Sequence, residues 1–278
     1  MTYRSCRIRI VKLARLLRAG FLALCFLLCF PAGLRASEAG TAPALPFDLP
    51  ALMEENEDVV GAVYIPALGI CDPVVWKEYE NTYYMEHDLY GGNSSSGCIM
   101  MDGWNRPDLA DCITFIHGHN MADGSMFGSL SSLMRDRALA LAEPLFYYYY
   151  VEKTPQEDAG DEGRGEVKAL CFRIYSYFTA DIYDRIYGPP EFYIYYHGPY
   201  WDGLTEEGRR VLEDYRDNWY DDLVADMGEQ AIHEMPDIDF SGRPKLMALS
   251  TCYGAVHGNE RFVVVGACVE VCVPEEGP

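Results

Sequence analysis

A cysteine near the end of the chain has neighbours whose types suit acyl-transfer chemistry. Cys252 follows a short apolar run in MALSTCYG (247–254), and Arg261 lies nine positions further on. A thiolate is a strong nucleophile, but an unassisted thiol, with a pKa of about 8.5, is only a few per cent ionised at neutral pH. Three interpretations of Cys252 are therefore open: a buried core thiol, one half of a disulfide, or a nucleophile with a positive group beside it.

Two histidines and the arginine are the groups that such a nucleophile needs. His117 and His119 lie in ITFIHGHNMADGSMFGSL (113–130), where an expected strand ends in a polar, glycine-bearing loop. The end of a strand is where a rigid scaffold presents side chains to a cleft. Arg261 stays charged and donates in a fixed fork, which suits the oxyanion that forms when a thiolate attacks a carbonyl. Each signal is weak alone, and together they form a candidate set.

The elements that would position these residues are mostly short strands. Strands are expected over eight segments separated by turn-prone stretches: 59–65, 70–76, 98–102, 112–116, 145–151, 168–178, 245–252 and 261–273. Helices are expected at 47–56, over 124–143 as one helix or two, and at 204–228. Many strands with few helices predict a β-barrel or sandwich with helical insertions.

The first 36 residues predict an export signal or a membrane anchor. They carry seven basic residues and no acidic one, and a 16-residue apolar block spans 19–34. A basic lead before an apolar block is typical of export, and the block is shorter than the about 20 residues of a comfortable span, so cleavage and retention both stay open. We therefore divide the chain into this segment (1–36), a linker (37–50) and a catalytic domain (51–278), exported to the outer face of the cytoplasmic membrane.

The exported part is strongly acidic, because only 15 of the 22 basic residues remain to face all 43 acidic ones. Such a surface disfavours nucleic acid and anionic lipid as partners. It is typical of a soluble, self-repelling extracellular domain, although a preference for basic partners is an alternative explanation.

The cysteine count argues against a disulfide framework. Seven of the ten cysteines follow residue 36, an odd number, so at least one is unpaired within a monomer. Cys268 and Cys272 lie four apart in an expected strand, a separation of roughly 13 Å that excludes a bridge between them. With no CxxC and no Cys/His cluster at zinc spacing, we expect no metal site. Most of these cysteines are expected to be small core residues.

The motifs taken together resemble those of the sortases, and within them class B. The resemblance rests on ALSTC (248–252), RFVVV nine residues later, GHNMADGSMFGSL far upstream, and YYMEHDLYGGNSSSGCIMMD (83–102). It runs from about Val59 to Val273. It implies a mainly β fold, a closed eight-stranded β-barrel with peripheral helices. These would include an N-terminal helix and a long helix inserted between two late strands.

The resemblance also implies a transpeptidase mechanism without a cofactor. Cys252 would be the nucleophile, His119 the acid/base and Arg261 the oxyanion or positioning arginine. The substrate would be a secreted surface protein with a C-terminal sorting signal of the LPxTG or NPxTN kind, cleaved after Thr through a thioacyl enzyme. An amine of a lipid-linked cell-wall precursor would then accept the acyl group. Four residues near the motifs are carried over as substrate-binding: Asn105, Leu109, Ser250 and Thr251.

Three departures and several alternatives accompany this hypothesis. Ala248 replaces a usual Thr, Tyr253 follows the nucleophile, and His117 replaces a common Tyr and is a rival to His119 for the acid/base role. The same residues could instead polymerise pilins or hydrolyse the acyl enzyme. A non-enzymatic exported binding domain, with an inert Cys252, is a further alternative.

Overall fold

The computed structural model describes residues 40–142, 144–152, 165–181, 220–231, 238–254 and 258–275. The strands are β1 (Gly40–Ala42), β2 (Val59–Ile65), β3 (Ile70–Val75), β4 (Ile99–Met101), β5 (Ile113–His117), β6 (Leu145–Glu152), β7 (Glu166–Asp181), β8 (Leu246–Cys252) and β9 (Glu260–Pro274). The helices are α2 (Leu49–Glu55), α3 (Ser132–Arg135) and α4 (Arg137–Ala142), with 3-10 turns at Pro66–Leu68 and Tyr83–Met85. Residues 220–230 are also helical.

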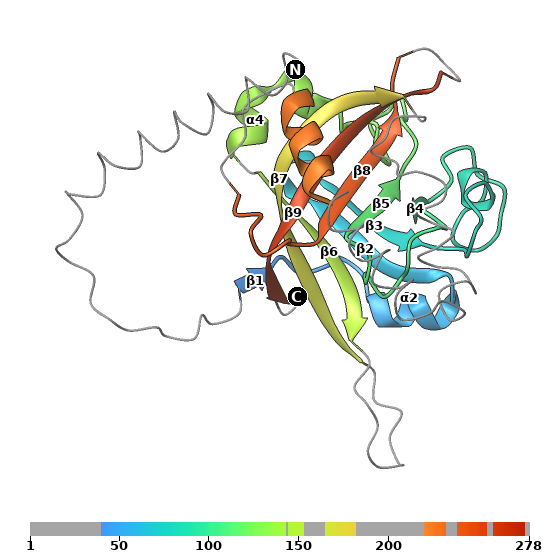
Figure 1. The fold of residues 1–278 in the computed structure, drawn as a ribbon. Helices are drawn as coiled ribbons and strands as arrows, with labels where there is room; N and C mark the ends of the chain where they lie inside the picture. The colour runs from blue at the N-terminus through green and yellow to red at the C-terminus, as the bar shows by residue number, and fades with distance from the viewer. Residues whose placement is uncertain are drawn as a thin grey trace, which may run out of the picture. The chain divides into compact units, whose positions relative to one another are not determined.

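Eight strands close into a mixed β-barrel, as the sequence predicted (Figure 1). The order β9-β7-β6-β2-β3-β4-β5-β8 returns to β9 through the β8–β9 pairing. The pairs β3–β4 and β5–β8 are parallel, and the other neighbours in this ring are antiparallel. Closure removes the exposed edges that an open sheet would present.

The barrel interior is filled by one apolar cluster. Alternate residues of β8 and β9 point into it, among them Met247, Leu249, Phe262 and Val264, all buried. The residues between them face outward, and the helix at 220–230 covers them with Tyr220, Leu223 and Met227. β8 is therefore covered on both faces up to Thr251, which explains its continuous apolar run.

The expected helices differ in how far the structure describes them. The segment 47–56 contains α2, which Asp48 caps by accepting a hydrogen bond from the Ala51 amide at 3.1 Å. The segment 124–143 contains two short helices, α3 and α4. Of the long helix expected at 204–228, residues 204–219 lie outside the described part.

Packing begins before the expected start of the domain at residue 51. β1 pairs in parallel with β9, with Gly40 opposite Cys272, and Ala42 and Leu49 are buried. The expected linker 37–50 thus contains a strand and the start of α2. Its sequence has no strand periodicity, because β1 is a three-residue strand held by its partner. The expected signal or anchor, 1–36, lies outside the described residues.

A search of the described residues for a helix both long and apolar enough to cross a membrane found none.

Candidate active site

A cavity of about 380 Å³ opens where β5, β8 and β9 meet. Its lining contains all three side chains expected to be catalytic, Cys252, His119 and Arg261. The other lining residues are Asn81, Met85, Cys98, Met100, Asp102, Trp104, His117, Gly118, Ser250 and Thr251. The site is therefore assembled from segments far apart in the sequence.

Strand register brings the cysteine and the arginine together. Cys252 and Arg261 are directly opposite in the antiparallel β8–β9 pair. Side chains of such directly opposed residues project from the same face of a sheet. Cys252 is the first exposed residue at the end of the otherwise buried β8, and its thiol is free. Cys252 is therefore not a buried thiol, and it forms no disulfide with any cysteine in the described part of the chain.

The parallel β5–β8 pair brings the histidine loop to the same end of the barrel. His117 is opposite Ser250, and the loop that follows is held by three hydrogen bonds. The Gly118 amide donates to the Ser250 carbonyl at 3.2 Å, and Thr251 Oγ1 donates to the Gly118 carbonyl at 2.8 Å. Asn120 Nδ2 donates to the Cys252 carbonyl at 2.8 Å. These bonds fix the residues on either side of His119 to the end of β8.

His119 has one ring nitrogen engaged. Its Nε2 lies 2.8 Å from the Met85 carbonyl oxygen, which can only accept, so Nε2 carries a proton. Among the residues that the structure describes, Nδ1 has no hydrogen-bond partner. In the neutral ring this nitrogen is the free basic site.

His117 is bound differently, through a carboxylate. Its Nε2 lies 3.0 Å from Asp102 Oδ2, with both side chains largely buried. Burial alone would raise the pKa of Asp102, but the hydrogen bond and charge of His117, followed by the Trp104 amide and Asn81, lower it below its ordinary value overall. Asp102 is therefore a carboxylate that holds the His117 ring.

Arg261 keeps part of its guanidinium unused. Nη1 donates to the carbonyls of Gly258 at 2.9 Å and Glu260 at 3.0 Å. Nε and Nη2 make no hydrogen bond with any described residue. Two bonds from one nitrogen orient the fork and leave donors for a ligand.

The four residues expected to bind substrate fall into two pairs. All four are buried, and Ser250 and Thr251 are among the cavity-lining residues, whereas Asn105 and Leu109 are not. The Asn105 amide is occupied, because Nδ2 donates to Asp111 and to the Ile113 carbonyl, and Oδ1 accepts from the Phe115 amide at 2.8 Å. Leu109 belongs to the barrel core.

Sequence reasoning missed several lining residues, notably Met85, Cys98, Asp102 and Trp104. All four lie in or just after the segment 83–102, which was recognised as a motif region without being assigned individual roles. The only signal in the sequence was this position, since contact with the histidine loop depends on the β4–β5 pairing.

The cavity contains the groups for covalent acyl transfer. It combines an exposed thiol with an imidazole nitrogen and guanidinium donors that make no hydrogen bond to any residue in the described ranges. These suit a nucleophile, a proton donor and acceptor, and a partner for a developing oxyanion. Among the described lining residues, no three potential metal ligands lie within ligating distance of one another.

Comparison with known proteins finds one similar curated sequence and a shared fold. No protein-family model matches it. A curated sortase B of Listeria monocytogenes is 26% identical over 201 residues, 72% of this chain and 65% of that protein, so the chain spans a little less than two thirds of this relative's length.

Solved structures agree on the fold. Sortase B from B. anthracis has a TM-score of 0.56 at 22% identity, covering 79% of this chain and 83% of that one. The sortase B–substrate complex of Staphylococcus aureus has a TM-score of 0.57 at 17% identity, covering 80% and 84%. The chain is thus similar in sequence to a curated sortase B and shares its barrel fold with solved sortase B structures.

Proposed function

We propose that this protein is a cysteine transpeptidase that attaches secreted surface proteins to the cell wall. It would cleave an LPxTG- or NPxTN-like sorting signal after Thr and transfer the acyl group to an amine of a lipid-linked wall precursor. The observation that carries the proposal is the shared cavity of Cys252, His119 and Arg261 at the open ends of β8 and β9. Similarity to a curated sortase B supports the same reaction class.

The first half-reaction forms the acyl enzyme. His119 takes the proton of the Cys252 thiol at Nδ1, and Sγ attacks the carbonyl carbon of the substrate Thr. A C–S bond forms, and the carbonyl electrons move to oxygen. The free donors of Arg261 stabilise this oxyanion. The intermediate collapses with cleavage of the C–N bond, and His119 gives its proton to the departing amine.

The second half-reaction reverses these roles. The acceptor amine attacks the thioester carbon, and His119 takes the proton that the amine loses. A new C–N bond forms, the C–S bond breaks, and the departing Cys252 sulfur takes this proton from His119, which restores the thiol and the neutral imidazole.

We assign the proton transfers to His119 rather than to His117. Nε2 of His117 is engaged with the Asp102 carboxylate, an arrangement suited to holding a ring in place. His119 is held only by a backbone carbonyl, which fixes its orientation and leaves Nδ1 for proton exchange. In this scheme Asp102 and His117 shape the cavity wall.

Substrate contacts are assigned to Ser250 and Thr251, both of which line the cavity. Asn105 and Leu109 would act on substrate indirectly, because their buried side chains support the loop that carries the lining residue Trp104. Export through the N-terminal segment, with its membrane contact, completes the proposal, and the acidic surface disfavours nucleic acid as a partner.

The test is acylation of the full chain by fluorogenic peptides of the LPxTG, PPxTG and NPxTN kinds, followed by intact-mass detection. We expect a covalent adduct that Cys252→Ala abolishes and Cys112→Ala, a thiol outside the cavity lining, retains. His119→Ala should lose turnover, whereas His117→Ala should keep most of it.

The acceptor decides the fate of the adduct. An added glycine or diaminopimelate-type amine should give the transfer product, and release of free acid alone would point to a hydrolase. Absence of any adduct with every peptide in folded, reduced protein would contradict the proposal and favour a binding domain.

A further inference from the structure

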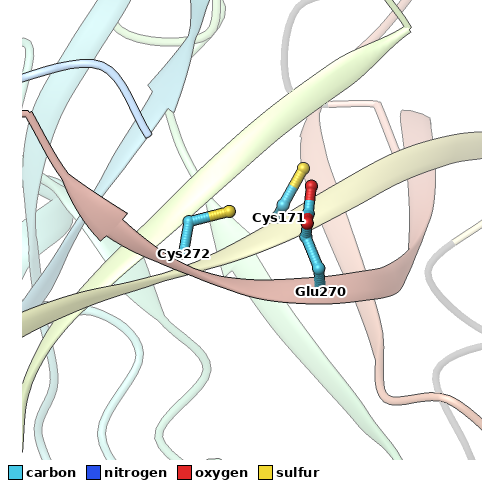
Figure 2. A group of neighbouring side chains, drawn as sticks. All are labelled: Cys171, Glu270 and Cys272. Atoms are coloured by element: carbon cyan, nitrogen blue, oxygen red, sulfur yellow. The ribbon is translucent and has the colours of Figure 1, made fainter. Parts of the chain in front are cut away.

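A second group of thiols lies on β7 and β9, away from the catalytic cavity. The potential ligand atoms of Cys171, Glu270 and Cys272 all lie within 4.8 Å of one another. Figure 2 shows the Cys272 sulfur pointing toward the neighbouring Cys171 and Glu270 side chains. None of the three residues lines the catalytic cavity. The group is therefore separate from the site of the proposed reaction.

Strand pairing accounts for the convergence. Cys171 on β7 is directly opposite Glu270 on β9, and Cys272 is opposite Ala169 two residues before Cys171. Residues two apart on a strand share a face, so all three side chains project from the same side of the β7–β9 pair. A β-bulge follows immediately, between Cys171 and Phe172. The three groups are held by the most extensively paired strands of the barrel.

A glycine on the neighbouring strand makes room for the carboxylate. Gly40 of β1 is opposite Cys272, and a Cβ atom at position 40 would lie 2.5 Å from Glu270 Oε2. Any larger residue there would push the carboxylate away from the thiols. Both thiols are about 1% exposed, while Glu270 is exposed. The arrangement is thus a buried thiol pair with one charged, solvent-facing oxygen donor.

We propose that Cys171, Glu270 and Cys272 form a binding site for a thiophilic divalent cation of the Zn²⁺ class. Two thiolates and a carboxylate are ligand types that Zn²⁺ binds, at about 2.3 Å for sulfur and about 2.0–2.2 Å for oxygen. Tetrahedral ligands at such lengths lie roughly 3.5–4 Å apart, so the group needs only a small closure. Water completes the coordination, and the two thiols release their protons to solvent on binding.

Such a site would connect three strands at the start of the folded domain. It would join β7 to β9 directly, and β1 would be held through the fit of Gly40 against Glu270. Sequence spacing predicted no metal site because the ligands come from two strands distant in the chain. The proposal does not depend on the transpeptidase reaction.

The test is Co²⁺ titration of the full chain, reduced and handled without oxygen, with Zn²⁺ as competitor. We expect thiolate-to-cobalt charge-transfer absorption that saturates at one ion per chain and disappears when Zn²⁺ is added. Zn²⁺ should also raise the thermal midpoint. Absence of this absorption in protein whose thiols all react with a thiol reagent would overturn the proposal.

Variants identify the ligands. Cys272→Ala should abolish the charge-transfer band, and Glu270→Gln, at an exposed position that tolerates substitution, should weaken binding at least about 10-fold. Gly40→Ala should weaken it by about 10-fold as well, since the new methyl group displaces the carboxylate.

Two matched controls should keep the band: Cys268→Ala, on the same strand but outside the group, and Cys252→Ala. A band lost in either control and kept in Cys272→Ala would overturn the assignment. So would a Cys171–Cys272 disulfide, seen as a loss of two hydrogens, in protein that binds no cobalt after reduction.

Discussion

At the start of β9, Arg261 lies opposite the exposed Cys252, whereas further along the same strand Glu270 lies opposite the buried Cys171. A guanidinium beside a thiol favours negative charge at that point, and a carboxylate disfavours it. Burial, then the charges of Cys272 and Glu270, raise the pKa of Cys171 to about 12. The two ends of β9 thus place side chains of opposite charge across from two thiols, Cys252 on β8 and Cys171 on β7.

Differential alkylation tests this comparison most strongly. With a pKa of about 12, Cys171 has a thiolate fraction on the order of 1,000-fold below that of an ordinary thiol, and burial slows it further. In metal-free buffer we expect iodoacetamide to modify Cys252 long before Cys171 or Cys272, as followed by peptide-resolved mass spectrometry. In urea the rates should converge. Equal alkylation rates of Cys252 and Cys171 in the folded protein would show that the two thiols do not differ in reactivity.

Removing the positive charge of Arg261, at the start of β9, should have the next largest effect. Arg261→Ala should lower kcat/KM for the acylating peptide by about 10²–10³-fold, the usual loss for an oxyanion donor. Arg261→Lys should recover only part, because an ammonium lacks the planar fork. Arg135→Ala, at a helix outside the cavity lining, is the matched control. Unchanged kcat/KM in Arg261→Ala would rule out its proposed role.

The smallest effect concerns the cavity wall beside Cys252. Asp102→Asn should lower stability at pH 7 by about 1–2 kcal/mol, because the bond to His117 loses its charge. The depressed pKa of Asp102 stabilises the fold above the unfolded value of about 3.9, and this contribution is lost as the pH falls through the folded value.

Urea midpoints between pH 3 and pH 7 should therefore converge for Asp102→Asn and wild type in acid. Asp108→Asn, in an exposed pair with Arg106, should change stability by less than about 1 kcal/mol. A constant difference across the pH range would show that Asp102 acts through packing alone.

The strands of the barrel could be predicted well from local pattern, with β1 as the exception, whereas closure into a barrel rather than a sandwich was implied only by the family resemblance. All eight expected strands coincide with β2 to β9, because each is a run of apolar or alternating residues bounded by turn signals. β1 was missed, since GTA (40–42) is a strand only through its pairing with β9. Propensity cannot reveal an element whose stability lies in its partner.

The residues expected at the candidate site also fall into two groups, those that the structure places in the cavity and those that it does not. The roles of Cys252, His119 and Arg261 stay predictions from residue type and motif, and the structure brings these three to one cavity. Asn105 and Leu109 were expected near substrate from their position alone, but Asn105 is used in backbone hydrogen bonds and Leu109 in the core. The sequence does not show the direction in which a loop side chain points.

Residue types and their periodicity by themselves determined the eight barrel strands and the mainly β class, because these depend on neighbours along the chain. Only the tertiary structure decided that His117 is held by Asp102 and that Cys171 and Cys272 meet a carboxylate beside Gly40. Those contacts depend on strand register, and a shift of one residue would turn each side chain to the opposite face of the sheet.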